Sequence, residues 1–182
     1  MAKKAVSKSV SVRTGHDLTT FILERNKIQS REFCSPGTEL SRRMYLAKHP
    51  SRILAMKCMD GRLNLALMTE TPPGIIQPFR NVGGKFDLGW PFFGHLVLEE
   101  IEEAVALGRP AVVLSTYHFS KGDMHRGCAG YQHDTKAAHD GARRLHDQFE
   151  RVFGGEASVV RTLVVGIETD EDTLIFENAR GQ

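Results

Sequence analysis

The chain has 182 residues, of which 41% are hydrophobic and 25% are charged, and its formal net charge is +2. This length and balance are typical of a folded chain with a full apolar core. The small charge and the scattered basic residues argue against a nucleic acid or an anionic membrane as the partner. No apolar run in the sequence reaches the length needed to cross a bilayer.

The N-terminal residues differ from the rest of the chain in composition. Residues 1–15 contain four basic side chains and no acid, and they lack the apolar stretch of a secretory signal. We predict a disordered, solvated basic arm over 1–15 and a single domain over 16–182. Docking of the arm on a partner or a neighbouring subunit, and an organelle transit peptide, are the alternatives. The expected location is the cytoplasm, with a carboxysome or an organelle as the other compartments to consider.

Helices are predicted where apolar residues recur at a spacing of three and four, and strands where short apolar runs are rich in β-branched residues. Pro78 falls inside one predicted strand and restricts it to the edge of a sheet or to its own end. In chain order, the predicted elements are helices over 17–27 and 38–47, strands over 52–57 and 75–80, a helix from Pro91 to Gly108, a strand over 111–117, a helix over 133–153, and strands over 158–167 and 173–177.

Strands and helices alternate along most of this order, which indicates an α/β fold. The short β-branched runs predict a central, mostly parallel β-sheet that is flanked by helices and covered on both faces. The last two strands are separated only by a short connection that contains the acidic turn Asp170–Asp172. A connection this short allows the final strand to pair antiparallel.

Two groups of chemically reactive residues stand out. Cys58, Asp60 and Arg62 directly follow a predicted buried strand. His125 and Cys128 precede the longest predicted helix. Ligand sites of α/β sheets lie at the carboxyl ends of the strands, so we expect the two groups to meet there.

The donor atoms of these groups favour a metal site. Two thiolates and one imidazole suit zinc above other divalent ions, and we predict Cys58, His125 and Cys128 as the ligands. Three protein ligands leave one tetrahedral position for water, whose pKa zinc lowers to about 7. A structural zinc site would need a fourth ligand. Cys34 lies in a separate turn region and is interpreted as an unliganded thiol.

Asp60 and Arg62 are two residues apart, so their side chains point to the same side of an extended segment. Asp60 could bind the metal itself, or Arg62 could hold it by a charge-assisted, bidentate hydrogen bond. In the second arrangement Asp60 stays ionised and accepts a hydrogen bond from the zinc-bound water. That hydrogen bond would direct a lone pair of the water toward a substrate.

These motifs together resemble a known family. Cys58-x-Asp60-x-Arg62 followed by His125-x-x-Cys128 resembles the zinc signature of the β-class carbonic anhydrases. Between them, residues 80–84 (RNVGG) resemble the Arg–Asn–Ala–Gly stretch of the same family. The order of predicted elements is also similar as far as about residue 177, so the resemblance covers most of the chain.

The resemblance implies a β-carbonic anhydrase-like fold and the reversible hydration of carbon dioxide to bicarbonate and a proton by a zinc-bound hydroxide. It assigns Asp60 and Arg62 to the catalytic machinery and implies a homodimer or homotetramer. It also implies two states. In the open state Asp60 pairs with Arg62, and in the closed state Asp60 binds zinc as the fourth ligand.

The sequence departs from the family pattern near the second group. Ala129 follows Cys128 where the family usually has glycine, and the segment 119–124 is longer than usual. His118 lies at the predicted strand end, where the histidine of the family normally lies. We nevertheless predict His125 as the ligand, because its two-residue spacing from Cys128 closes a local chelate. His118 is interpreted as a loop residue or as a supporting residue beside the site.

Two other functions remain open at this point. A hydrolase for carbonyl sulfide or carbon disulfide could use the same zinc hydroxide, and the unusual segment 119–124 motivates this alternative. A catalytically inactive, zinc-bound interaction protein is the third possibility, with the basic arm as its docking segment.

Overall fold

The computed structural model describes residues 15–155 and 158–177. By its contacts, the chain divides into two compact units, Met1–Ser41 and Arg42–Gln182. Residues 1–14 of the predicted basic arm lie outside the described residues. The prediction of a single domain over 16–182 stays a prediction. Within the described residues, no helix is both long and apolar enough to cross a membrane.

Two helices precede the sheet, and both are longer than predicted. They are α1 (Gly15–Phe33) and α2 (Pro36–Lys48). Ser35 separates them, and its hydroxyl oxygen accepts a hydrogen bond from the backbone N–H of Thr38 at 3.3 Å. A serine at this position satisfies one of the N–H groups that the first turn of a helix leaves unpaired, which explains why α2 begins here.

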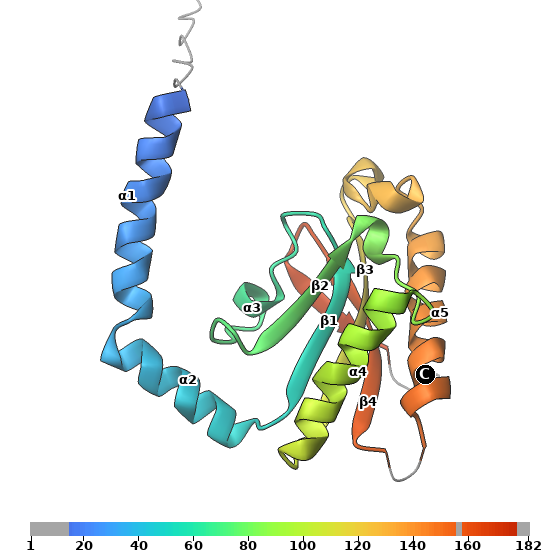
Figure 1. The fold of residues 1–182 in the computed structure, drawn as a ribbon. Coiled ribbons are helices and arrows are strands. Elements are labelled where there is room, and N and C mark those ends of the chain that lie inside the picture. The colour runs from blue at the N-terminus through green and yellow to red at the C-terminus, as the bar shows by residue number, and fades with distance from the viewer. Residues whose placement is uncertain (1–14, 156–157, 178–182) are drawn as a thin grey trace, which may run out of the picture. The chain divides into compact units, whose positions relative to one another are not determined.

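The second unit is built on a five-stranded sheet with the order β2-β1-β3-β4-β5 (Figure 1). The pairs β1–β2, β1–β3 and β3–β4 are parallel, and β5 is antiparallel to β4. This confirms the predicted α/β fold, including the antiparallel last strand. The strands are β1 (Arg52–Cys58), β2 (Ile76–Asn81), β3 (Ala111–Phe119), β4 (Val160–Glu168) and β5 (Thr173–Phe176).

Pro78 lies in β2, which is an edge strand of this sheet. Because proline has no N–H to donate to a second neighbour, it is tolerated at an edge and not in the middle of a sheet. The sequence-based restriction of this strand to an edge is therefore confirmed.

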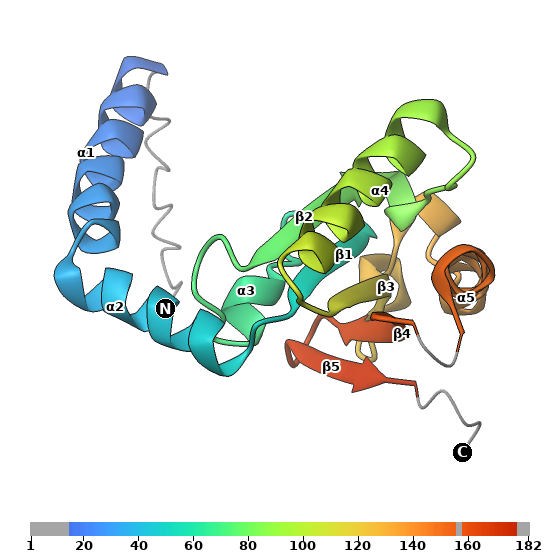
Figure 2. The same cartoon turned by 60° about the horizontal axis from the view of Figure 1, so that its bottom comes forward.

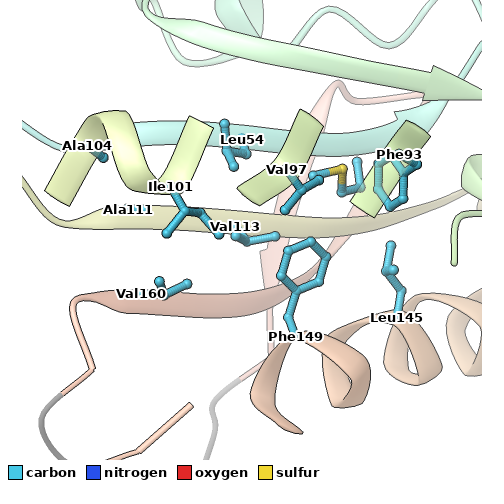
Figure 3. Packing of buried hydrophobic residues seen from close by; sticks show 11 residues of the cluster. Leu54, Phe93, Val97, Ile101, Ala104, Ala111, Val113, Leu145, Phe149 and Val160 are labelled. Atoms are coloured by element: carbon cyan, nitrogen blue, oxygen red, sulfur yellow. The ribbon is translucent and has the colours of Figure 1, made fainter. Parts of the chain in front are cut away.

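Two long helices cover one face of the sheet, as Figures 1 and 2 show. They are α4 (Pro91–Ala106) and α5 (Thr135–Phe153). Figure 3 shows their apolar side chains directed at the strands: Val97 and Ile101 of α4 and Leu145 and Phe149 of α5 meet Val113 of β3. Phe149 and Val97 are fully buried, so this face forms the main core.

A smaller apolar cluster lies on the other side of β1. It contains Ala55, which alternates with Leu54 and Met56 of the main core along the strand. Leu63 and Leu65 join it from the connection between β1 and β2, where the short helix α3 (Leu65–Met68) lies. Three single-turn helices complete the unit: η1 (Val82–Gly84), η2 (Met124–Arg126) and η3 (Ala129–Tyr131).

The strand order creates a position where ligands are expected. From β1 the chain continues to β2 on one side, and after α4 it returns to β3 on the other side of β1. In open α/β sheets, ligands bind at the carboxyl ends of the strands where the strand order reverses in this way. The carboxyl ends of β1 and β3 are therefore the place to look for a functional site.

Candidate metal centre

Two of the three side chains in the candidate centre come from the neighbouring strands β1 and β3. Cys58 is the last residue of β1, and His118 is the penultimate residue of β3. Because the two strands are adjacent and parallel, both residues lie at the same end of the sheet, where the strands have their carboxyl ends. The sheet itself thus brings a thiol and an imidazole together.

Cys128 completes the group from the loop between η2 and η3. The ligand atoms of Cys58, His118 and Cys128 all lie within 4.8 Å of one another, and all three residues are buried. The two sulfur atoms are 4.0 Å apart. Two sulfurs bound at about 2.3 Å to one tetrahedral zinc ion would be separated by about 3.8 Å, so the spacing fits a shared metal.

His118 is an unusual histidine. It is 1% exposed, and among the residues that the structure describes neither of its ring nitrogens makes a hydrogen bond of regular geometry, although the imidazole is close enough to help lower the pKa of Cys58. Burying an unpaired polar atom is unfavourable, by about 1–3 kcal/mol in proteins. A metal ion bound to one ring nitrogen would remove part of this cost. The orphaned imidazole between two thiols is thus a direct indication that the site accommodates a metal.

The structure does not bring His125 to the two thiols, so the predicted ligand set requires a correction at this position. His125 is exposed in η2, where its backbone N–H donates to the Asp123 carboxylate. Its ring packs edge-on against the ring of His133, with 5.9 Å between the centroids. The physical reason is the length of β3, which ends at Phe119 and not at 117. His118 therefore remains in the sheet, while the following turn carries His125 to the surface.

A hydrogen bond links the two thiols. The Cys128 thiol donates to the Cys58 sulfur, and this lowers the pKa of Cys58 far below that of a free thiol. The same interaction, together with burial, raises the pKa of Cys128. A metal ion would displace the proton of this hydrogen bond, because both ligands must be thiolates. Cys34, by contrast, is exposed and does not belong to the group.

Asp60 and Arg62 form the predicted ion pair. Nη2 of Arg62 lies 2.6 Å from Oδ2 of Asp60, and Nε lies 3.1 Å from Oδ1. The backbone N–H of Arg62 donates to Oδ1 as well, at 3.0 Å. These hydrogen bonds, above all those of the Arg62 side chain, lower the pKa of Asp60 to about 2. Asp60 is therefore an oriented carboxylate at any pH near neutral.

Two cations fix the turn that carries this ion pair. Nζ of Lys57 and Nη2 of Arg80 both donate to the carbonyl oxygen of Leu63, each at 2.8 Å. Lys57 is 3% exposed, and burial followed by repulsion from Arg80 lowers its pKa to about 8. The arginine of the 80–84 motif thus has a structural role here, which is to hold the end of the Cys58–Leu63 turn.

Glycines allow the three motifs to approach one another. A Cβ added to Gly130 would lie 2.6 Å from the backbone N and Cα of Gly83, which itself has φ +70°. A Cβ on Gly84 would lie 3.2 Å from the backbone N of Cys58. Only residues without side chains permit this contact between η1, η3 and the end of β1. Ala129, which departs from the family pattern, is exposed and does not disturb the contact.

The fold is that of the β-carbonic anhydrases. The chain superimposes on the β-carbonic anhydrase CafA of Aspergillus fumigatus with a TM-score of 0.56 and 16% identity, covering 91% of this chain and 93% of that one. A tetrameric β-carbonic anhydrase of Sordaria macrospora gives a TM-score of 0.57 with 11% identity, covering 90% and 98%. At these identities the likeness establishes the shared fold.

The sequence is similar to a more particular group. Residues 102–177 match the model of the carboxysome shell carbonic anhydrase catalytic domain. The carboxysome shell carbonic anhydrase of Hydrogenovibrio crunogenus is 32% identical over 141 residues, which covers 69% of this chain. The sequence matches and the shared fold support membership of the β-class carbonic anhydrase family. This chain spans 26% of the length of that relative.

The close approach of the glycines generates a prediction for stability. The substitution Gly130→Ala should lower the free energy of unfolding by about 1–3 kcal/mol, because the added methyl group would force η1 and η3 apart. Gly61→Ala is the matched control, since an added Cβ there meets no atom within 4 Å. Its effect should stay within about 0.5 kcal/mol. Chemical denaturation measures both, and equal stability of the two variants would contradict the role given to Gly130.

Proposed function

We propose that this chain is a zinc-dependent carbonic anhydrase that interconverts carbon dioxide and water with bicarbonate and a proton. The observation that carries the proposal is the buried group of Cys58, His118 and Cys128 with the Asp60–Arg62 ion pair on the segment that directly follows Cys58. The similarity to the β-class family supports this reaction over others. Because the chain spans only 26% of its matched relative, the proposal rests on the residues of this chain.

The donor set determines which metal the proposal names. Two thiolates and one imidazole favour zinc, and three protein ligands leave a fourth position open, as in catalytic sites. Zinc supplies Lewis acidity, which makes water a nucleophile at neutral pH. Cys58, His118 and Cys128 are the proposed ligands, with His118 in place of His125.

Asp60 and Arg62 are the proposed catalytic pair. Arg62 keeps the Asp60 carboxylate ionised and orients it, so that Asp60 can accept a hydrogen bond from a water at the open position. That hydrogen bond would fix the direction in which the water presents its lone pair to carbon dioxide. The pairing of Asp60 with Arg62 supports the open state, and Asp60 as a fourth ligand of a closed state stays a prediction.

We also infer that the functional protein is a homodimer or homotetramer. Large apolar side chains are exposed on different elements, including Leu67 (72%) and Phe92 (86%). Exposed apolar surface of this kind favours association with another subunit. The cytoplasmic location stays a prediction. The name of the matched relative makes the carboxysome the compartment to test first.

The reaction is tested by stopped-flow hydration of carbon dioxide on the purified chain, with zinc quantified in the same sample. We expect activity with about one zinc per chain. Asp60→Asn and Arg62→Ala should retain the zinc and lose about 100-fold in kcat/KM, because each removes the orientation of the attacking water. Asp147→Asn, an exposed carboxylate on α5, is the control and should leave kcat/KM unchanged.

Two outcomes of this assay would contradict the proposal. Zinc-loaded protein that releases sulfide from carbonyl sulfide or carbon disulfide, but does not hydrate carbon dioxide, would show that the site serves a different linear substrate. Zinc-loaded protein without activity on any of these substrates would indicate an interaction protein. Full activity of both Asp60→Asn and Arg62→Ala would refute the role of this pair but leave the reaction itself in place.

The third ligand is tested separately by metal content. His118→Ala should lose most of its zinc, because it removes a buried ligand at the carboxyl end of β3, whereas His125→Ala should keep about one zinc per chain. Elemental analysis after dialysis against a chelator measures both variants. Circular dichroism checks that each variant is folded. Loss of zinc in His125→Ala with retention in His118→Ala would restore the ligand set predicted from sequence spacing.

A further inference from the structure

The Arg62 side chain has a second partner that lies far away in the sequence. Its Nη2 donates to Oδ2 of Asp60 at 2.6 Å and also to the backbone carbonyl oxygen of Arg126 at 2.7 Å. A guanidinium group that is bound on two sides has fewer orientations available than one that is bound on one side. The carbonyl of Arg126 therefore helps to determine where Arg62, and with it Asp60, points.

A single carboxylate fixes the loop that contains Arg126. Oδ1 of Asp170 lies 2.9 Å from Nη1 of Arg126. Oδ2 of Asp170 accepts hydrogen bonds from the Ser120 hydroxyl at 2.6 Å and from the backbone N–H of Gly122 at 2.8 Å. Asp170 thus binds the loop near its beginning and near its end. The hydrogen bonds from Ser120 and Gly122 also lower the pKa of Asp170, so that it is ionised at neutral pH.

Asp170 is in turn held by the buried Glu168. The Glu168 carboxylate is fully buried and accepts three backbone N–H groups, those of Lys121 at 3.0 Å, Asp170 at 3.0 Å and Glu171 at 2.7 Å. These bonds are possible because Phe119 of β3 and Glu168 of β4 are paired in the sheet. The two loops that follow these strands therefore leave the sheet side by side.

The contacts form one continuous chain from the β4–β5 turn to the candidate centre. Glu168 fixes Asp170, Asp170 fixes the loop through Arg126, and the carbonyl of Arg126 binds Arg62. The same loop lies between His118 and Cys128 in the sequence. Asp170 is not a member of the metal-binding group and does not contact Asp60 in any hydrogen bond or ion pair described above.

We propose that Asp170 is a positioning residue, which holds the 120–127 loop so that the Arg126 carbonyl keeps Arg62 oriented toward Asp60. Asp170 acts through Arg126 and Arg62 and takes no part in the chemistry itself. The effect of Asp170 on the reaction rate rests on the proposed carbonic anhydrase function. Its effect on the mobility of the Arg62 side chain does not.

A purely structural role for Asp170 makes a different prediction. If Asp170 only stabilised the fold, its removal would lower the unfolding free energy and leave the Arg62 side chain as it is. If Asp170 positions Arg62, its removal loosens that side chain in protein that is still folded and metal-loaded. The Nε–H of Arg62 reports this directly, because it donates to Asp60.

The test compares Asp170→Ala and Arg126→Met with the control Glu171→Gln in the zinc-loaded 182-residue chain. Arg126→Met removes the same ion pair from an exposed side chain, so it serves if Asp170→Ala does not fold. Glu171 lies in the same turn, but within 15–155 and 158–177 its side chain forms an ion pair only with the exposed Lys121, at 3.4 Å. Nitrogen-15 NMR follows hydrogen exchange of the Arg62 Nε–H, which is assigned by its absence in Arg62→Lys.

We expect faster Nε–H exchange and a loss of about tenfold in kcat/KM in both test variants, as for one lost hydrogen bond to a charged group, with neither change in Glu171→Gln. The double variant should lose no more activity than Asp170→Ala alone, since both changes remove one ion pair. Unchanged Nε–H exchange in folded, zinc-loaded Asp170→Ala or Arg126→Met would overturn the proposal. If the wild-type chain does not hydrate carbon dioxide, the proposed function fails, and the exchange measurement still decides the role of Asp170.

Discussion

The parallel pairing of β1 with β3 is the constraint on which the candidate centre depends. It places the carboxyl end of β1, with Cys58, beside the carboxyl end of β3, with His118. The main core, built from α4 and α5 against the same strands, fixes this pairing. A shift of one strand by one residue would turn its side chains to the opposite face and separate the imidazole from the thiol.

The rest of the site is arranged around these strand ends by contacts between backbones. Gly130 lies against Gly83, and Gly84 lies against the end of β1, so the segment with Cys128 can approach Cys58. The carbonyl of Leu63 is bound by Lys57 and Arg80, and the carbonyl of Arg126 is bound by Arg62. In each case a cationic side chain meets a backbone oxygen. These contacts help to place the ion pair of Asp60 and Arg62.

Local sequence patterns were sufficient for the fold and for the pairing of Asp60 with Arg62. The alternation of strands and helices predicted the parallel sheet, and Pro78 predicted an edge strand, because both depend on short stretches of residues. Asp60 and Arg62 lie within one turn after Cys58, so their spacing alone indicated that the two side chains could pair. The prediction of His125 failed because it relied on spacing in the sequence, whereas the strand continues two residues further and keeps His118 at its carboxyl end.

Other contributions depend on pairs of residues that lie far apart in the sequence. Glu168 and Asp170 read as the end of a strand and an acidic turn, and nothing local shows that they bind the loop before Cys128. The register of Phe119 with Glu168 creates these contacts, and local sequence patterns do not determine the register between strands that are far apart in the chain. The same limit applies to Arg126, whose contribution to the pair is made by its backbone.

The central claim is that Cys58, His118 and Cys128 hold one zinc ion and leave a fourth position open. X-ray absorption at the zinc edge of the purified, zinc-loaded protein tests it most directly. The account predicts two sulfur ligands at about 2.3 Å and two lighter ligands at about 2.0–2.2 Å. It further predicts that His118→Ala weakens this signature while His125→Ala leaves it unchanged. Three or more sulfur ligands, or zinc bound equally well without His118, would contradict the account.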